Sequence, residues 1–205
     1  ELYALKQQGH PNVHYLPHGV DFELFHKAAE APRRLDEIGG LTHPIAGYFG
    51  TLTGSNDIAL WEYCAQQLPD VHFVLAGRVT GGDYSNLKRM KNVTMPGFIP
   101  YEKIPALCAN FDVCMLNWKV TPWIRSCNPL KMFEYMASGK PLVSVAIQEA
   151  EQYNDIISIA SDKEDFRRLL QWELENDTPL RQQKRIEVAR RHDWQQKVSE
   201  LSVLI

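Results

Sequence analysis

The sequence predicts an α/β fold built on a doubly wound parallel sheet, followed by carboxy-terminal helices. Short apolar runs rich in Val, Ile and Phe alternate with amphipathic stretches along about three quarters of the chain. Polar segments with helical periodicity fill the remainder. The 205 residues are 44% apolar, which is enough to bury the core of one domain.

Apolar, β-branched runs predict strands, in chain order, over Val13–Leu16, Ile45–Phe49, Val71–Ala76, Val93–Met95, Val113–Leu116, Leu142–Ala146 and Ile156–Ala160. A helix over Glu1–Gln8 precedes them, and amphipathic stretches between them predict helices over Asn56–Leu68, Tyr101–Asn110, Pro129–Ser138 and Ala150–Asn154. After the last strand we expect three successive helices, Lys163–Asn176, Pro179–His192 and Trp194–Leu204, with Asp162, Thr178 and Asp193 as their N-caps.

The helix predicted over Pro129–Ser138 carries the strongest functional signal. Pro129 suits its first turn, and Gly139 suits its carboxy-terminal cap. Lys131 and Glu134 are three residues apart and therefore neighbours on one face. The start of a helix offers unpaired N–H groups and the positive end of the dipole. We therefore expect an anion here, such as a phosphate next to a hydroxyl-bearing sugar, although such a pair is also common as a surface ion pair.

In a doubly wound sheet, ligands bind outside the carboxyl ends of the strands. Five predicted loops gather at that edge: Gly50–Ser55, Gly77–Ser85, Pro96–Tyr101, Asn117–Asn128 and Ala146–Glu149. Gly50–Ser55 follows a predicted strand and opens a helix, so its glycines permit close backbone approach and the helix start offers N–H donors for phosphate; the alternative is an ordinary βα turn that needs glycine for its backbone angles. It matches neither the Walker loop nor the GxGxxG dinucleotide fingerprint.

Composition argues against several classes of function. A net charge of −3 and a pI near 6.2 provide no basic field for nucleic acid. The cysteines form no CxxC pair, so neither a zinc site nor a disulfide framework is indicated, and we expect reduced thiols: Cys64, Cys108, Cys114 and Cys127. The histidines give no metal pattern either.

Residues 128–145 resemble the donor-binding signature of GT-B glycosyltransferases, most closely the form with Pro-Leu-Lys before a Glu-Tyr pair that is frequent in bacterial polysaccharide-assembling enzymes. Segments at residues 16–25, 48–52, 73–77, 92–100 and 111–116 agree with that family in order and spacing. The resemblance implies a Rossmann-like, carboxy-terminal nucleotide-sugar-binding domain over residues 1–205, hence an excised portion of a longer protein whose amino-terminal acceptor domain lies outside this sequence.

The resemblance also implies the roles of individual residues. Glu134 would bind the ribose hydroxyls of a nucleotide sugar and Lys131 its diphosphate, and these two are the residues expected to serve catalysis. The wider set expected to contact the donor is Gly50, Thr51, Arg78, Phe98, Ile99, Asn128, Leu130, Lys131 and Glu134. UDP is expected from its frequency in the family, and such enzymes work without a bound metal or further cofactor.

Two departures from the family pattern affect these expectations. Many relatives carry an arginine and a lysine after the glycine loop, where this chain has Asn56 and Asp57, so Lys131, Arg78 and Arg125 are the cations left for phosphate. The acidic residue expected eight positions before Glu134 is Ser126, which leaves the stereochemical course open. In the same loop we interpret Trp118 and Trp123 as anchors to the protein body, with a sugar-facing role as the alternative.

As a whole, the sequence is interpreted as the donor domain of a glycosyltransferase acting on a saccharide or lipid-linked acceptor in the cytoplasm, with peripheral attachment to the inner face of the membrane left open. Alone it should bind donor but transfer poorly or not at all. Two alternatives remain: a nucleotide-sugar epimerase of the same fold, and a degenerate scaffold domain without activity. Titration with UDP, GDP and ADP separates the scaffold from the other two.

Overall fold

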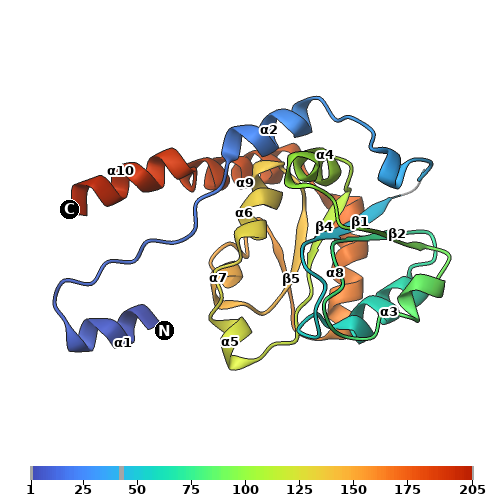
Figure 1. The fold of residues 1–205 in the computed structure, drawn as a ribbon, viewed down its shortest axis with the longest axis horizontal. Coiled ribbons are helices and arrows are strands. Elements are labelled where there is room, and N and C mark those ends of the chain that lie inside the picture. Colours follow the sequence, from blue (N-terminus) through green and yellow to red (C-terminus); the bar gives the residue numbers. More distant parts are fainter. Residues whose placement is uncertain (1, 42–43, 205) are drawn as a thin grey trace.

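The computed structural model describes residues 2–41 and 44–204. Its centre is a six-stranded sheet in the order β3-β2-β1-β4-β5-β6, with every neighbouring pair parallel (Figure 1). The strand order reverses between β1 and β4, which is the switch point of a doubly wound sheet. The strands are β1 (Ile45–Phe49), β2 (His72–Ala76), β3 (Val93–Gly97), β4 (Val113–Leu116), β5 (Leu142–Val145) and β6 (Ser158–Ala160).

Helices cover both faces of the sheet (Figure 1). In chain order they are α1 (Leu2–Gly9), α2 (Phe22–Glu30), α3 (Ile58–Gln67), α4 (Ile104–Ala109), α5 (Pro122–Arg125), α6 (Leu130–Ala137), α7 (Gln148–Glu151), α8 (Lys163–Asn176), α9 (Pro179–Arg191) and α10 (Trp194–Leu204). Single 3₁₀ turns occur at Asp36–Ile38, Leu87–Arg89 and Tyr101–Lys103. Contacts join α3 to α8 in one layer, and α2 to α4, α6 and α9 in the other. This division follows from right-handed crossovers that run in opposite directions from the switch point.

Most predicted elements are present, with ends shifted by at most three residues. The strand predicted over Val13–Leu16 is wrong: the segment forms no ladder with another described strand, so its apolar alternation has no sheet to join. Helices α2 and α5 were not predicted. All three N-caps are confirmed, because their side chains accept hydrogen bonds from first-turn amides in α8, α9 and α10.

Helix α6 begins one residue later than predicted. Pro129 has φ −80° and ψ 111°, so it is the N-cap and not the first helical residue. At the other end Gly139 has φ +69°, a left-handed conformation that favours glycine. The amides of Gly139 and Lys140 donate to the carbonyls of Met136 and Tyr135 at 2.9 and 3.2 Å, which is a Schellman cap. Sequence-local chemistry therefore fixes both ends of this helix.

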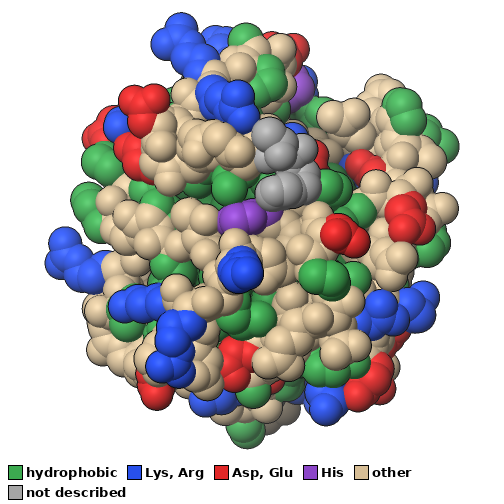
Figure 2. Space-filling model, turned by 90° about the vertical axis from the view of Figure 1, so that its right-hand side faces the viewer, with side chains coloured by type: hydrophobic (Ala, Val, Ile, Leu, Met, Phe, Trp, Pro, Cys, Tyr) green, Lys and Arg blue, Asp and Glu red, His purple; other side chains and the backbone are tan. Residues whose placement is uncertain are grey.

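The core consists of the strands and the inward faces of the helices. Four strands, β1, β2, β4 and β5, are buried along their whole length. On the surface drawn in Figure 2, basic and acidic side chains are interspersed with apolar ones. Within residues 2–41 and 44–204, no helix combines the length and the apolar character needed to cross a bilayer.

Candidate functional site

A cleft of about 690 Å³ opens at the carboxyl edge of the sheet. The ends of β1, β2 and β3, the loop after β4 and the first turns of α6 form its walls. It therefore lies at the switch point, where the sheet topology places ligand sites. Its lining residues are Phe49, Gly50, Thr51, Ala76, Gly77, Arg78, Thr80, Phe98, Ile99, Tyr101, Ile104, Trp118, Pro129, Leu130, Lys131 and Glu134.

Eight of the nine residues predicted to contact the donor line this cleft, and Asn128 does not. Asn128 lines a second cavity of about 490 Å³ beside α1 and α7. Its side chain accepts a hydrogen bond from the backbone N–H of His18 at 3.3 Å and donates to the Tyr15 hydroxyl at 3.2 Å. The chain thus turns between Asn128 and Pro129, so that neighbours in sequence face different cavities.

Glu134 presents a nearly buried carboxyl group to the cleft. The residue is 4% exposed, and its Oε1 accepts a hydrogen bond from the Tyr101 hydroxyl at 3.2 Å. Burial raises the pKa of Glu134 to about 7, while the Tyr101 hydrogen bond and the charge of Lys131 act in the opposite direction. A buried carboxylate with a free oxygen in a cleft is suited to accept hydrogen bonds from ligand hydroxyls.

Lys131 lies one turn before Glu134 and presents its ammonium group to the same cleft. The Nζ atom lies 5.1 Å from the ring centroid of Tyr48 and 4.9 Å from that of Trp118. Its aliphatic end passes close to Gly50, where a Cβ atom would approach Cε and Nζ to 3.1 Å. The side chain is therefore held between two aromatic rings and a glycine.

The start of α6 adds backbone donors to this group. Proline has no side-chain acceptor, and Pro129 as N-cap makes no side-chain cap bond. The Met132 amide donates to the Pro129 carbonyl at 3.0 Å, and no side chain of Pro129 competes with a ligand for the amides of Leu130 and Lys131. The positive end of the helix dipole and the Lys131 ammonium then favour an anion at one place.

The glycine loop after β1 differs from its prediction. Helix α3 begins only at Ile58, and the carboxylate of Asp57 caps it by accepting from the Leu60 amide at 3.0 Å. Within the loop, the amides of Gly50, Leu52 and Thr53 donate to protein acceptors. The helix after this loop thus starts two residues later than predicted, and the approach of phosphate to the loop stays a prediction. What the loop provides is close packing: a Cβ at Gly77 would lie 1.9 Å from the Gly50 carbonyl oxygen.

The opposite wall of the cleft combines an arginine with apolar side chains. The Arg78 guanidinium lies over the Phe98 ring at 5.4 Å, and Phe98 is 64% exposed. The neighbouring Ile99 is buried. Since Phe98 leaves most of its ring uncovered, this wall can pack against a planar ligand.

Sequence reasoning assigned no role at the cleft to Tyr101, taken only as the start of a helix, or to Tyr48, taken only as part of a strand; Tyr101 lines the cleft, and the buried Tyr48 contacts Lys131 without lining it. Trp118, interpreted as an anchor of its loop with a sugar-facing role as the alternative, lines the cleft as well. The available signal was the position of Tyr48 and Trp118 at the carboxyl ends of β1 and β4. Trp123 is 74% exposed, so its interpretation as an anchor of the loop is wrong. Arg125, the third candidate cation, is exposed on α5 outside the cleft lining.

The part of the chain that the structure describes holds no group of three or more His, Cys, Asp or Glu residues able to bind a metal ion. Its four cysteines are free, and three of them are buried. The cleft itself offers the Lys131 ammonium group, the Arg78 guanidinium, the buried Glu134 carboxyl group, helix amides and an apolar wall. That set suits a ligand with adjoining anionic, hydroxylated and planar parts.

A family model described as glycosyl transferase-like matches residues 59–202. TuaH of Bacillus subtilis (strain 168), whose name assigns it to teichuronic acid biosynthesis as a glycosyltransferase, is 32% identical over 138 residues, which are 66% of this chain and 34% of TuaH. The chain thus spans about a third of the length of this curated relative.

Solved structures share the fold. Sucrose-phosphate synthase of Thermosynechococcus elongatus has a TM-score of 0.68 at 17% identity, over 92% of this chain and 51% of that one. HepE of Anabaena, solved in complex with UDP and glucose, has a TM-score of 0.67 at 18% identity, over 90% of this chain and 55% of that one. The predicted fold class, a Rossmann-like sheet of the GT-B carboxy-terminal type, is confirmed.

Proposed function

The chain belongs to the glycosyl transferase-like family, and from that premise we propose that its cleft binds a nucleoside diphosphate sugar, with UDP as the nucleotide, as the donor in sugar transfer. The acceptor is a saccharide or a lipid-linked saccharide, held by a part of the protein outside this sequence. UDP is supported by HepE, whose structure contains UDP and glucose.

One observation carries this proposal: the Lys131 ammonium and the Glu134 carboxyl group share one cleft at the open start of α6. The diphosphate lies against the helix amides and Lys131, and Glu134 accepts hydrogen bonds from the ribose. The uracil ring packs on the wall formed by Phe98 and Ile99. Thr51 and Arg78 line the same cleft as Lys131. Thr51 is placed to contact the sugar of the donor, and Arg78 its diphosphate.

This arrangement stabilises the leaving group. During transfer the bond between the anomeric carbon and the diphosphate oxygen breaks, the acceptor oxygen forms the new bond, and the diphosphate leaves with an additional negative charge. A fixed ammonium group and helix amides at that position stabilise the charge as it develops. The proton of the acceptor hydroxyl passes to a base outside this chain.

Calorimetric titration of the 205-residue chain with UDP, GDP and ADP tests the proposal. We expect UDP to bind most tightly. Lys131→Ala should weaken UDP about 10- to 100-fold, the usual value of a hydrogen bond to a charged group, and leave uridine nearly unchanged. Glu134→Ala should weaken both, because both contain the ribose.

The matched control is Glu102→Ala, which removes an exposed glutamate near the cleft that does not line it. Its affinities should equal those of the unmodified chain. Failure of all three nucleotides to bind would contradict the proposal and favour a scaffold domain.

A further inference from the structure

We propose that Trp118 and Tyr48 are positioning residues, which hold the Lys131 ammonium group between their ring faces at the place where the donor diphosphate binds. This inference rests on the proposed function and adds to it the two side chains that orient its cation. They act through Lys131 and do not themselves bind phosphate.

The geometry of the three side chains supports this role. The Lys131 Nζ lies 5.1 Å from the Tyr48 ring centroid and 4.9 Å from the Trp118 centroid, both within the range of cation–π attraction. The Trp118 indole N–H points to the Tyr48 hydroxyl at 3.4 Å. The two rings therefore form one aromatic clamp, which we define as Tyr48 and Trp118.

Rigid parts of the fold hold both rings in place. Tyr48 is 1% exposed on β1, and its ring meets that of Trp61 edge-on at 5.0 Å. Trp118 forms an antiparallel bridge with Asn56, which is fully buried. The next amide, that of Lys119, donates to the Ser55 carbonyl at 2.9 Å. The clamp is therefore set before any ligand arrives.

The clamp also leaves the charge of Lys131 available. Among the residues the structure describes, no carboxylate oxygen lies within 4.0 Å of its Nζ. A carboxylate partner would orient the lysine but neutralise it, whereas ring faces orient it and leave its full charge for phosphate. Since the side chain is already ordered, a diphosphate loses less affinity to the entropy of immobilising it.

A double-mutant cycle on the 205-residue chain tests the proposal, with UDP and uridine as the probes. We expect Trp118→Leu to weaken UDP about three- to tenfold, the usual strength of a cation–π contact, and to leave uridine unchanged. In the Lys131→Ala background the same substitution should have no further effect on UDP. Trp118→Phe, which keeps a ring face, should restore most of the affinity.

Two further measurements keep the outcome decisive. The control Trp123→Leu removes an exposed tryptophan from the same loop outside the cleft, and it should change neither affinity. In the free protein, the Lys131 Cε–Hε resonance, identified with Lys131→Ala, should be shifted upfield by the two rings and should lose that shift in Trp118→Leu.

The alternative outcomes separate this inference from the function on which it rests. If UDP binds and Lys131→Ala weakens it, but Trp118→Leu weakens UDP equally in both backgrounds, Trp118 contacts the ligand directly and the positioning role is overturned. An equal loss for uridine, or an unshifted lysine resonance, overturns it too. If the unmodified chain does not bind UDP, the proposed function fails and the inference fails with it.

Discussion

At the scale of single residues, Glu134 shows how the cleft selects its chemistry. A carboxyl group in water is ionised at neutral pH, yet burial raises the pKa of Glu134 to about 7. Its partner Tyr101 does not titrate in that range, because burial and the charge of Glu134 raise the Tyr101 pKa to about 12. The pKa of Glu134 in the fold is therefore close to neutral pH, so the carboxyl group gains or loses its proton there. Hydrogen bonds from ribose hydroxyls favour its ionised form.

The raised pKa predicts how stability depends on pH. The unfolded chain releases this proton at about pH 4.3, whereas the folded chain retains it until about pH 7. Between these values the folded state binds more protons, so stability falls as pH rises. Glu134→Gln cannot ionise, and its stability relative to the unmodified chain should rise by roughly 2–3 kcal/mol from pH 5 to pH 8. Urea unfolding at both pH values measures this difference.

Glu102→Gln serves as the control for that measurement, because this neighbouring glutamate is exposed. Its stability relative to the unmodified chain should be nearly constant with pH. An equally constant difference for Glu134→Gln would show that the carboxyl group at position 134 titrates normally in the folded protein.

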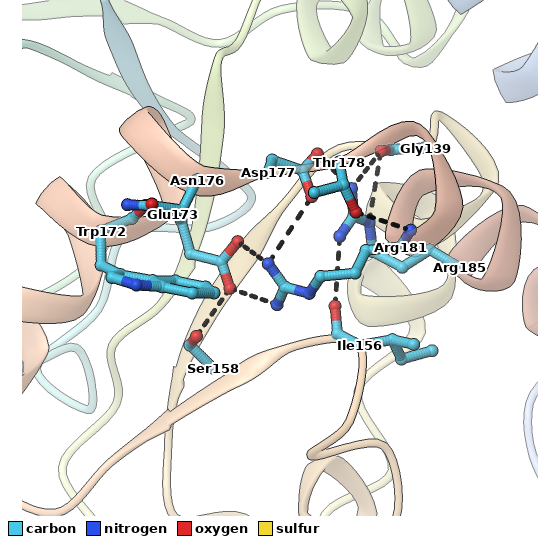
Figure 3. A network of polar contacts seen from close by, with 10 residues as sticks. All are labelled: Gly139, Ile156, Ser158, Trp172, Glu173, Asn176, Asp177, Thr178, Arg181 and Arg185. Carbon is cyan, nitrogen blue, oxygen red and sulfur yellow. Dashed lines mark hydrogen bonds and ion pairs between the residues drawn. The ribbon is translucent and has the colours of Figure 1, made fainter.

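At the scale of elements, a network of polar contacts joins α9 to Gly139, the residue that ends α6 (Figure 3). Arg185 of α9 is fully buried, and its Nη2 donates to the Gly139 carbonyl at 2.9 Å and its Nη1 to the Ile156 carbonyl at 3.2 Å. It also pairs with Asp177. Arg181 meets the buried Glu173 in two bonds of 2.7 Å. Through Gly139, α9 secures the end of the helix that carries the site.

This network predicts a large stability effect far from the cleft. Arg185→Met leaves two buried carbonyls without their donor and Asp177 without its cation, so it should lower the free energy of unfolding by about 3 kcal/mol. Arg168→Gln is the control: it breaks an exposed ion pair with Asp165 and should cost less than about 1 kcal/mol. Urea unfolding compares the two variants, and equal losses would contradict a structural role for the buried network.

At the scale of the whole molecule, sequence patterns predicted the features that depend on residues close together in the chain, namely the strands and the helix ends. Apolar runs placed the six strands, and Gly139 marked the end of α6, because burial and a left-handed cap leave signals in the sequence. The segment Val13–Leu16 has the apolar alternation of a strand but pairs with no described strand. A sequence pattern does not show whether a second strand lies beside a segment. The clamp was missed for a related reason: Tyr48 and Trp118 are 70 residues apart and meet only because β1 pairs with β4.

The cleft also joins the two halves of the sheet, and this leads to a prediction for the whole chain. Its walls come from β1, β2 and β3 on one side of the switch point and from the β4–α6 segment on the other. A ligand bound there contacts both halves and should stabilise them as one unit. At a concentration about 100 times its dissociation constant, UDP adds about 2.7 kcal/mol to the folded state. For a chain of 205 residues, that corresponds to a rise in Tm of roughly 5–10 °C.

Scanning calorimetry with UDP and with uridine at equal concentration measures this shift. Uridine lacks the diphosphate, so it should bind more weakly and raise Tm less. Lys131→Ala should reduce the UDP shift toward that of uridine, because the substitution removes the ammonium group that contacts the diphosphate and leaves the helix amides and Arg78 to hold it. A shift confined to one of two separate transitions would show that the halves unfold independently and that the cleft does not couple them.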